Sequence, residues 1–174
     1  ETARFFEARL CAGAGRNAVH FIKQRGLDGA TVKKFRIGYA PKSGLRAVLA
    51  GKGFSDDDMI LAGVLGKSGH DGRLFEYFRD RVIFPIENRQ GKVVAFGARA
   101  LGDVQPKYLN SAENPTFYKK AVLYGWVQAR KAVRSKLPLV VVEGYMDVIA
   151  VQRSCVAAAV APLGTALTPE QIAL

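Results

Sequence analysis

A carboxylate that follows an apolar run is the feature of this sequence best suited to chemistry. Residues 139–142 read LVVV, and Glu143 and Gly144 come directly after them. Parallel sheets bind ligands at the carboxyl ends of their strands, and glycine permits the sharp turn needed there. A carboxylate at such an edge can hold a divalent ion or accept a proton from an attacking hydroxyl. Asp147 lies one helical turn further on and could support the same ion.

Acids at these positions also have a structural interpretation. Acidic side chains in the first turn of a helix are stabilised by the helix dipole, which alone accounts for many of them. The consecutive aspartates 56–58 pose the same choice, since they resemble a metal cluster but follow Ser55 with the S-x-x-D spacing of a capping box. Consecutive helical residues point in different directions, so we expect a helix N-terminus there.

The elements around Glu143 follow a β-α-β-α pattern. We expect a strand over 139–142, a helix over 145–151 and a second, buried strand over 156–160. Thr168 and Gln171 have capping-box spacing, and Pro169 occupies the first helical position of a final helix. Two strands cannot close a doubly wound parallel sheet, so we expect this α/β unit to be truncated.

The preceding residues predict an α+β domain. Short helices are expected over residues 1–72, a β-hairpin over 82–101 with its turn at 88–91, a strand over 106–109 and a basic helix over 127–133. We therefore predict two domains. The first is a basic N-terminal domain, residues 1–137, with helices and a small sheet, and the second is the incomplete α/β unit of residues 138–174.

Charge indicates the kind of partner. The 174 residues carry a net charge of +11, of which residues 73–136 contribute +8, while residues 137–174 carry −2. A basic middle beside a slightly acidic end favours nucleic acid or nucleotide as the partner, although a solvated basic surface is the alternative. No apolar run approaches the roughly 18 residues of a membrane span. Cys11 and Cys155 support neither a disulfide framework nor a zinc site, so a cytoplasmic location is expected.

Several motifs resemble one known family. The stretch VVVEGYMDVIA, with FRDRVIFPIENRQGKVVAFGARAL and PKYLNS before it and PLGTALT after it, is similar to the RNA polymerase core of bacterial DnaG-type primases, as are RIGYAP and LYG. EGYMDV resembles the opening motif of the Toprim fold, which topoisomerases and some nucleases share. The basic segment before it distinguishes primases. The resemblance implies a DNA primase, a DNA-directed RNA polymerase that makes short RNA primers for DNA replication from ribonucleoside triphosphates on a single-stranded DNA template.

The resemblance also implies roles for individual residues. Glu143 would be a metal ligand and acid/base group and Asp147 a supporting ligand, with Mg²⁺ as the ion and Mn²⁺ as an alternative. Thr165 in the PLGTA turn would either line the site or lead into the next helix. Tyr108 could stack on a base or be buried. Template phosphates and the incoming triphosphate need positive partners, and the implied nucleotide- and nucleic-acid-binding residues are Arg99, Lys107, Tyr108, Asn110 and Lys119, with Lys34, Arg79 and Arg81 as further candidates.

The chain departs from the complete family pattern. A Toprim site also needs an Asp-x-Asp strand, which would fall beyond Leu174, and Glu143 alone cannot hold two metal ions. We therefore expect the fragment itself to be inactive, and we expect a zinc-binding module and the region that contacts a replicative helicase to lie outside it. Two alternatives stay open: a Toprim nuclease or topoisomerase, and a non-catalytic nucleic-acid-binding module. An Asp-x-Asp after a third apolar strand would support an enzyme.

Overall fold

A four-stranded antiparallel sheet organises the N-terminal part of the chain. The computed structural model describes residues 1–164 and 166–174 and orders the strands β1 (Gly38–Ala40), β4 (Arg81–Glu87), β5 (Val93–Ala100) and β6 (Tyr108–Asn110). β4 and β5 form the predicted hairpin, whose turn is closed by the Asn88 amide donating to the Lys92 carbonyl at 2.9 Å. The predicted hairpin and the third strand after it are confirmed.

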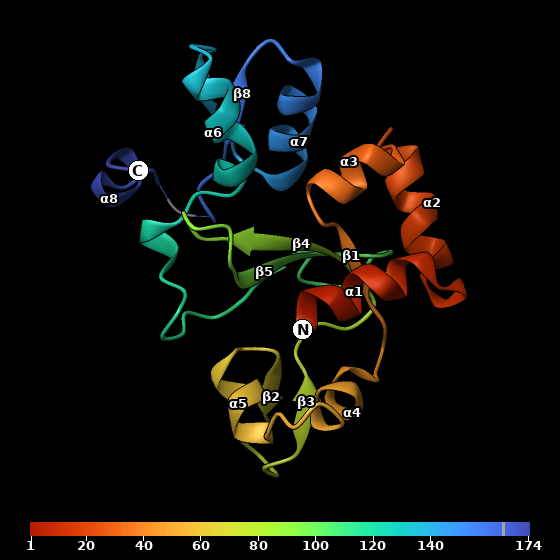
Figure 1. Cartoon of the computed structure of the whole chain (residues 1–174). Helices are drawn as coiled ribbons and strands as arrows, with labels where there is room; N and C mark the ends of the chain where they lie inside the picture. The colour runs from red at the N-terminus through yellow and green to blue at the C-terminus, as the bar shows by residue number, and fades with distance from the viewer. Residues whose placement is uncertain (165) are drawn as a thin grey trace.

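Helices surround this sheet, as Figure 1 shows. α1 (Thr2–Cys11), the 3-10 turn η1 (Gly13–Gly15), α2 (Arg16–Gln24) and α3 (Gly29–Lys34) lead into β1. The Asp28 side chain caps α3 by accepting from the Thr31 amide at 2.7 Å. The chain then forms a small lobe, at the bottom of Figure 1, from α4 (Leu45–Ala50), α5 (Asp56–Leu61), β2 (Leu65–Lys67) and β3 (Leu74–Glu76). Ser55 and Asp58 form the expected capping box, so the aspartates are a helix N-terminus.

The expectation of short helices over residues 1–72 was incomplete. β1 and β2 both lie in this range, and each is only three residues long. A three-residue strand is too short to show an alternating pattern, and these two form because β1 pairs with β4 and β2 pairs with β3. β1 therefore depends on a partner that is distant in sequence, whereas β2 and β3 form a short local hairpin.

The sheet separates two hydrophobic cores. Val82, Phe84 and Ile86 on one face pack into a cluster with α2, α3 and the C-terminal part of the chain. Ile83 and Ala98 on the other face pack into a cluster with α1 and the small lobe. Strand residues alternate between the faces of a sheet, so neighbouring residues of β4 serve different cores. Both faces are covered, and this positions β6 rigidly beside the C-terminal unit.

The C-terminal unit has the predicted β-α-β-α order. β7 (Leu139–Val141) pairs in parallel with β8 (Ala158–Val160), α7 (Tyr145–Ser154) connects them, and α8 (Pro169–Ile172) begins at the predicted Thr168 capping box. α6 (Trp126–Arg134) packs through Ala129 on Ala158 and Val160, whereas α7 packs on the cluster that contains Ala159. The small parallel sheet thus lies between α6 and α7 (Figure 1).

β7 differs from the buried strand that its sequence suggests. Leu139, Val140 and Val141 are 41%, 36% and 48% exposed, whereas all of β8 is buried. β7 pairs only with β8 among the described strands, so it forms the edge of this sheet. An edge strand with apolar side chains leaves them in contact with solvent.

One core is continuous across the predicted domain boundary at 137/138. The cluster with Val82 and Phe84 also contains Tyr145, Val148 and Ile149 of α7. The boundary itself stays a prediction. Within the described ranges, 1–164 and 166–174, no helix is long and apolar enough to cross a membrane.

Candidate functional site

Glu143 lies in the turn between β7 and α7, at the carboxyl end of the strand, as predicted. Its side chain is exposed and lines a cavity of about 410 Å³. Tyr108 and Asn110 of β6 line the same cavity, as do residues 161–164. The structure therefore brings the predicted acid to the nucleotide-binding face predicted on β6.

Asp147 lines the same cavity but also has a structural task. Its Oδ2 accepts a hydrogen bond from the Gly144 amide at 3.1 Å, and this contact caps the start of α7. A carboxylate has further lone pairs, so Asp147 can cap the helix and still offer an oxygen to a cation. The capping interpretation of Asp147 is therefore confirmed, and its role as a cation ligand stays a prediction.

Arg25, which sequence reasoning did not select, also lines this cavity. It is exposed at the end of α2, far from Glu143 in the sequence, so no local motif links the two residues. Its guanidinium carbon lies 5.4 Å from the centroid of the Phe21 ring. Arg25 supplies a positive charge to a cavity that otherwise presents two carboxylates.

A stack of planar groups extends from Arg25 to the sheet. The Arg99 guanidinium carbon lies 5.5 Å from the Phe21 ring centroid and 5.2 Å from that of Tyr108. Arginine and aromatic planes therefore alternate from α2 to β6, at distances that are favourable for cation–π contact. The Tyr108 side chain is 46% exposed. The structure therefore leaves much of this aromatic group accessible, as base stacking requires.

Arg99 and Arg81 are buried cations on adjacent strands, 8% and 5% exposed. Nη1 of Arg99 donates to the Ala100 carbonyl at 2.7 Å, and Nη1 of Arg81 donates to the Pro106 carbonyl at 2.8 Å. Across the residues that the structure describes, neither forms a salt bridge and Nε of Arg99 has no partner. Burial, and secondarily the nearby Arg99, lowers the pKa of Arg81. Buried charge without a counterion is unfavourable, so this end of the sheet is suited to an anion.

The other predicted basic residues divide into two groups. Lys107 is exposed and its carbonyl accepts from the Ala100 amide at 2.9 Å, which places it beside Arg99 in the sheet. The cavity lining contains none of the predicted basic residues: Lys34, Arg79, Arg81, Arg99, Lys107 and Lys119 all lie outside it. Lys34 lies over the Phe35 ring, Arg79 lies over Phe75 of the small lobe, and the Lys119 carbonyl accepts from Gln171 near α8. Their roles stay predictions.

The donor set suits a hard cation only in part. Glu143 and Asp147 offer carboxylate oxygens, which Mg²⁺ prefers. In the part of the chain that the structure describes, no group of three or more His, Cys, Asp or Glu side chains is placed to hold a metal ion. The two acids can therefore contribute to a metal site without forming a complete one. Thr165 lies outside the described residues.

Comparison with known proteins agrees with this arrangement. The family model "DNA primase catalytic core, N-terminal domain" matches residues 5–130, and the Toprim domain model matches residues 138–174. A basic α+β domain followed by a Toprim unit defines a class of proteins, the primase-type catalytic cores. The chain belongs to the family of DnaG-type DNA primase catalytic cores.

Individual relatives support the same assignment. The chain is 44% identical over 177 residues to a DNA primase of Pasteurella multocida and 43% identical over 173 residues to that of Pseudomonas aeruginosa, and these matches cover 100% and 98% of the chain. It spans only 30% and 26% of the length of those two proteins.

Solved structures agree in fold. The DnaG primase catalytic domain bound to ssDNA has a TM-score of 0.87 at 38% identity, over 98% of this chain and 56% of that one. A DNA primase domain from Pseudomonas aeruginosa has a TM-score of 0.87 at 42% identity, over 98% of this chain and 54% of that one. The predicted fold, a basic α+β domain followed by the start of a Toprim sheet, is confirmed.

Proposed function

We propose that this chain is part of an enzyme that synthesises short RNA primers on single-stranded DNA by joining ribonucleoside triphosphates. The observation that carries the proposal is one cavity that combines Glu143 with the β6 residues Tyr108 and Asn110 and with Arg25. The relatives named DNA primase and the similar domain solved with ssDNA support it. The match to the primase N-terminal domain favours this reaction over a Toprim nuclease or topoisomerase.

In the proposed nucleotidyl transfer, the residues in and beside the cavity have different roles. The 3′-hydroxyl of one nucleotide attacks the α-phosphate of the next, so a new oxygen–phosphorus bond forms and pyrophosphate leaves. Arg25 and the Arg99 end of the sheet hold phosphates, and the exposed ring of Tyr108 stacks on a base. In this proposal, Glu143 accepts the hydroxyl proton. These residues bind and orient the two nucleotides.

Glu143 and Asp147 are also the residues that would hold a divalent cation, with Mg²⁺ as the expected ion and Mn²⁺ as an alternative. Bound there, the cation would stabilise negative charge on the phosphate oxygens. We further propose that the protein acts in the cytoplasm beside a replicative helicase. No residue of this chain is assigned to the helicase contact, and zinc is assigned to a separate module.

The test is the Glu143→Gln substitution in the full-length protein. We expect primer synthesis on a single-stranded template to be abolished and the Kd for template to stay within twofold of the unsubstituted protein. Glu170→Gln is the matched control, because Glu170 is also an exposed acid near the start of a helix and does not line the cavity. Normal synthesis by Glu143→Gln contradicts the catalytic assignment. Template binding without synthesis by the unsubstituted protein would favour a binding module.

A further inference from the structure

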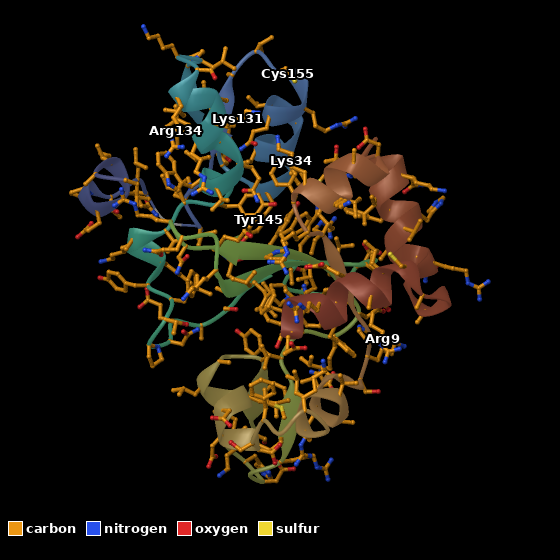
Figure 2. The ribbon with its side chains drawn as sticks, in the orientation of Figure 1. Arg9, Lys34, Lys131, Arg134, Tyr145 and Cys155 are labelled. Atoms are coloured by element: carbon orange, nitrogen blue, oxygen red, sulfur yellow. The ribbon has the colours of Figure 1, made fainter. Side chains whose placement is uncertain are left out.

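Tyr145 is a buried residue at the first position of α7, two residues after Glu143, and nothing above gives it a role. Only 6% of it is exposed, and Figure 2 shows it between α7 and the central sheet. Its ring is nearly parallel to that of Phe84 on β4, with the centroids 5.0 Å apart, and meets the Tyr124 ring edge-on at 4.7 Å. The residue that follows the catalytic turn is therefore anchored in the N-terminal sheet.

The Tyr145 hydroxyl is directed at a second candidate residue. It donates to Oδ1 of Asn110 at 2.6 Å, and Nδ2 of Asn110 donates to the Leu163 carbonyl at 3.3 Å. Burial, and secondarily the nearby Tyr108, raises the pKa of Tyr145 well above its usual value, so the hydroxyl remains a proton donor. One side-chain amide thus joins three segments that surround the cavity: β6, the start of α7 and the 161–164 turn.

The sheet has space for the Tyr145 ring because residue 97 of β5 is a glycine. A Cβ on Gly97 of β5 would lie 2.1 Å from Cζ of Tyr145 and 2.2 Å from its hydroxyl oxygen. Gly97 is paired directly with Asn110 in the β5–β6 register. The backbone of β5 and the Asn110 amide therefore hold the ring from two sides.

We propose that Tyr145 is a positioning residue which, through its hydrogen bond to Asn110, sets the separation between Glu143 and the nucleotide-binding face of β6. The inference rests on the proposed function. Glu143 is exposed, and the backbone of its turn connects it directly to the anchored Tyr145. Loss of the hydroxyl leaves Oδ1 of Asn110 without its donor, and the Glu143 turn can then shift relative to β6. Misplacement of reacting groups by about 1 Å can lower a rate by as much as roughly 100-fold.

The experiment is Tyr145→Phe in the full-length protein, which keeps the ring and removes one hydroxyl. We expect kcat for primer synthesis at saturating nucleotide to fall at least tenfold, with the Kd for single-stranded template within twofold. The matched control is Tyr39→Phe, since Tyr39 is also buried and donates its hydroxyl to a side chain, Asp80, at 2.9 Å. It should keep kcat within twofold. A kcat within twofold in Tyr145→Phe overturns the inference, as does an equal loss in both variants.

A double variant separates positioning from independent nucleotide contacts. If Tyr145 acts through Asn110, then adding Tyr145→Phe to Asn110→Ala should change kcat less than twofold further. A full additional tenfold loss would show that the two residues act separately and would overturn the inference. Failure of the proposed function looks different, because the unsubstituted protein would then make no primers or Glu143→Gln would still make them.

Discussion

Gly97→Ala in this chain is the substitution whose effect the structure determines most directly. The added Cβ would lie 2.1 Å from Cζ of Tyr145, so the ring must move about 1.3 Å to reach the 3.4 Å of ordinary contact. Stacked Phe84 and edge-on Tyr124 oppose that movement. Overpacking of a core costs about 1–3 kcal/mol, and losing the hydroxyl hydrogen bond to Asn110 costs about 0.5–1.5 kcal/mol.

We therefore expect the free energy of unfolding to fall by about 1.5–4.5 kcal/mol, and the Tm by roughly 3–18 °C for a chain of this size. Urea and thermal unfolding measure both quantities. Gly29→Ala is the matched control, because nothing lies within 4 Å of the position of its Cβ and Gly29 begins α3. It should be neutral or stabilising by up to about 1 kcal/mol. A Gly97→Ala chain as stable as the unsubstituted one would refute the described packing of Tyr145.

Three further outcomes are expected. The affinity for single-stranded DNA should fall by about 0.7 log units per log unit of salt for each phosphate neutralised. Filter binding between roughly 50 and 200 mM salt measures this slope. An affinity that does not change with salt would count against DNA binding by the basic residues of 73–136. Asp147→Asn should leave the Tm unchanged, because the side-chain oxygen of asparagine can still accept a hydrogen bond from the Gly144 amide. Isothermal titration on the full-length protein should show weaker Mg²⁺ binding by this variant. Unchanged Mg²⁺ binding would assign Asp147 to helix capping alone. Burial, followed by the hydrogen bond to Asp80, raises the pKa of Tyr39 from 10.0 to about 12, so the folded state keeps this proton longer than the unfolded state. Its contribution to stability should be complete below pH 10 and lost as pH rises to 12, and urea titrations should show a smaller loss in Tyr39→Phe than in the unsubstituted chain.

Local signals were sufficient wherever the cause of a structure is local. The capping boxes at Ser55 and Thr168 and the turn at 88–91 all involve residues within four positions of one another, and all were confirmed. The place of Glu143 at a strand end followed in the same way from an apolar run and a glycine. The short strands β1 and β2 were missed because three residues carry no period, and the partner of β1 is also distant in sequence.

The amino-acid sequence by itself determined the order of the elements from β4 onward, the basic middle of the chain and the acid at the turn, because helix capping, hydrophobic period and charge are properties of neighbouring residues. Only the tertiary structure decided which side chains share the cavity. It added Arg25, left all six predicted basic residues outside the cavity lining and linked Tyr145 to Asn110. The physical reason is that these contacts depend on how the sheet packs against α2 and α7, and that packing is settled by the whole core.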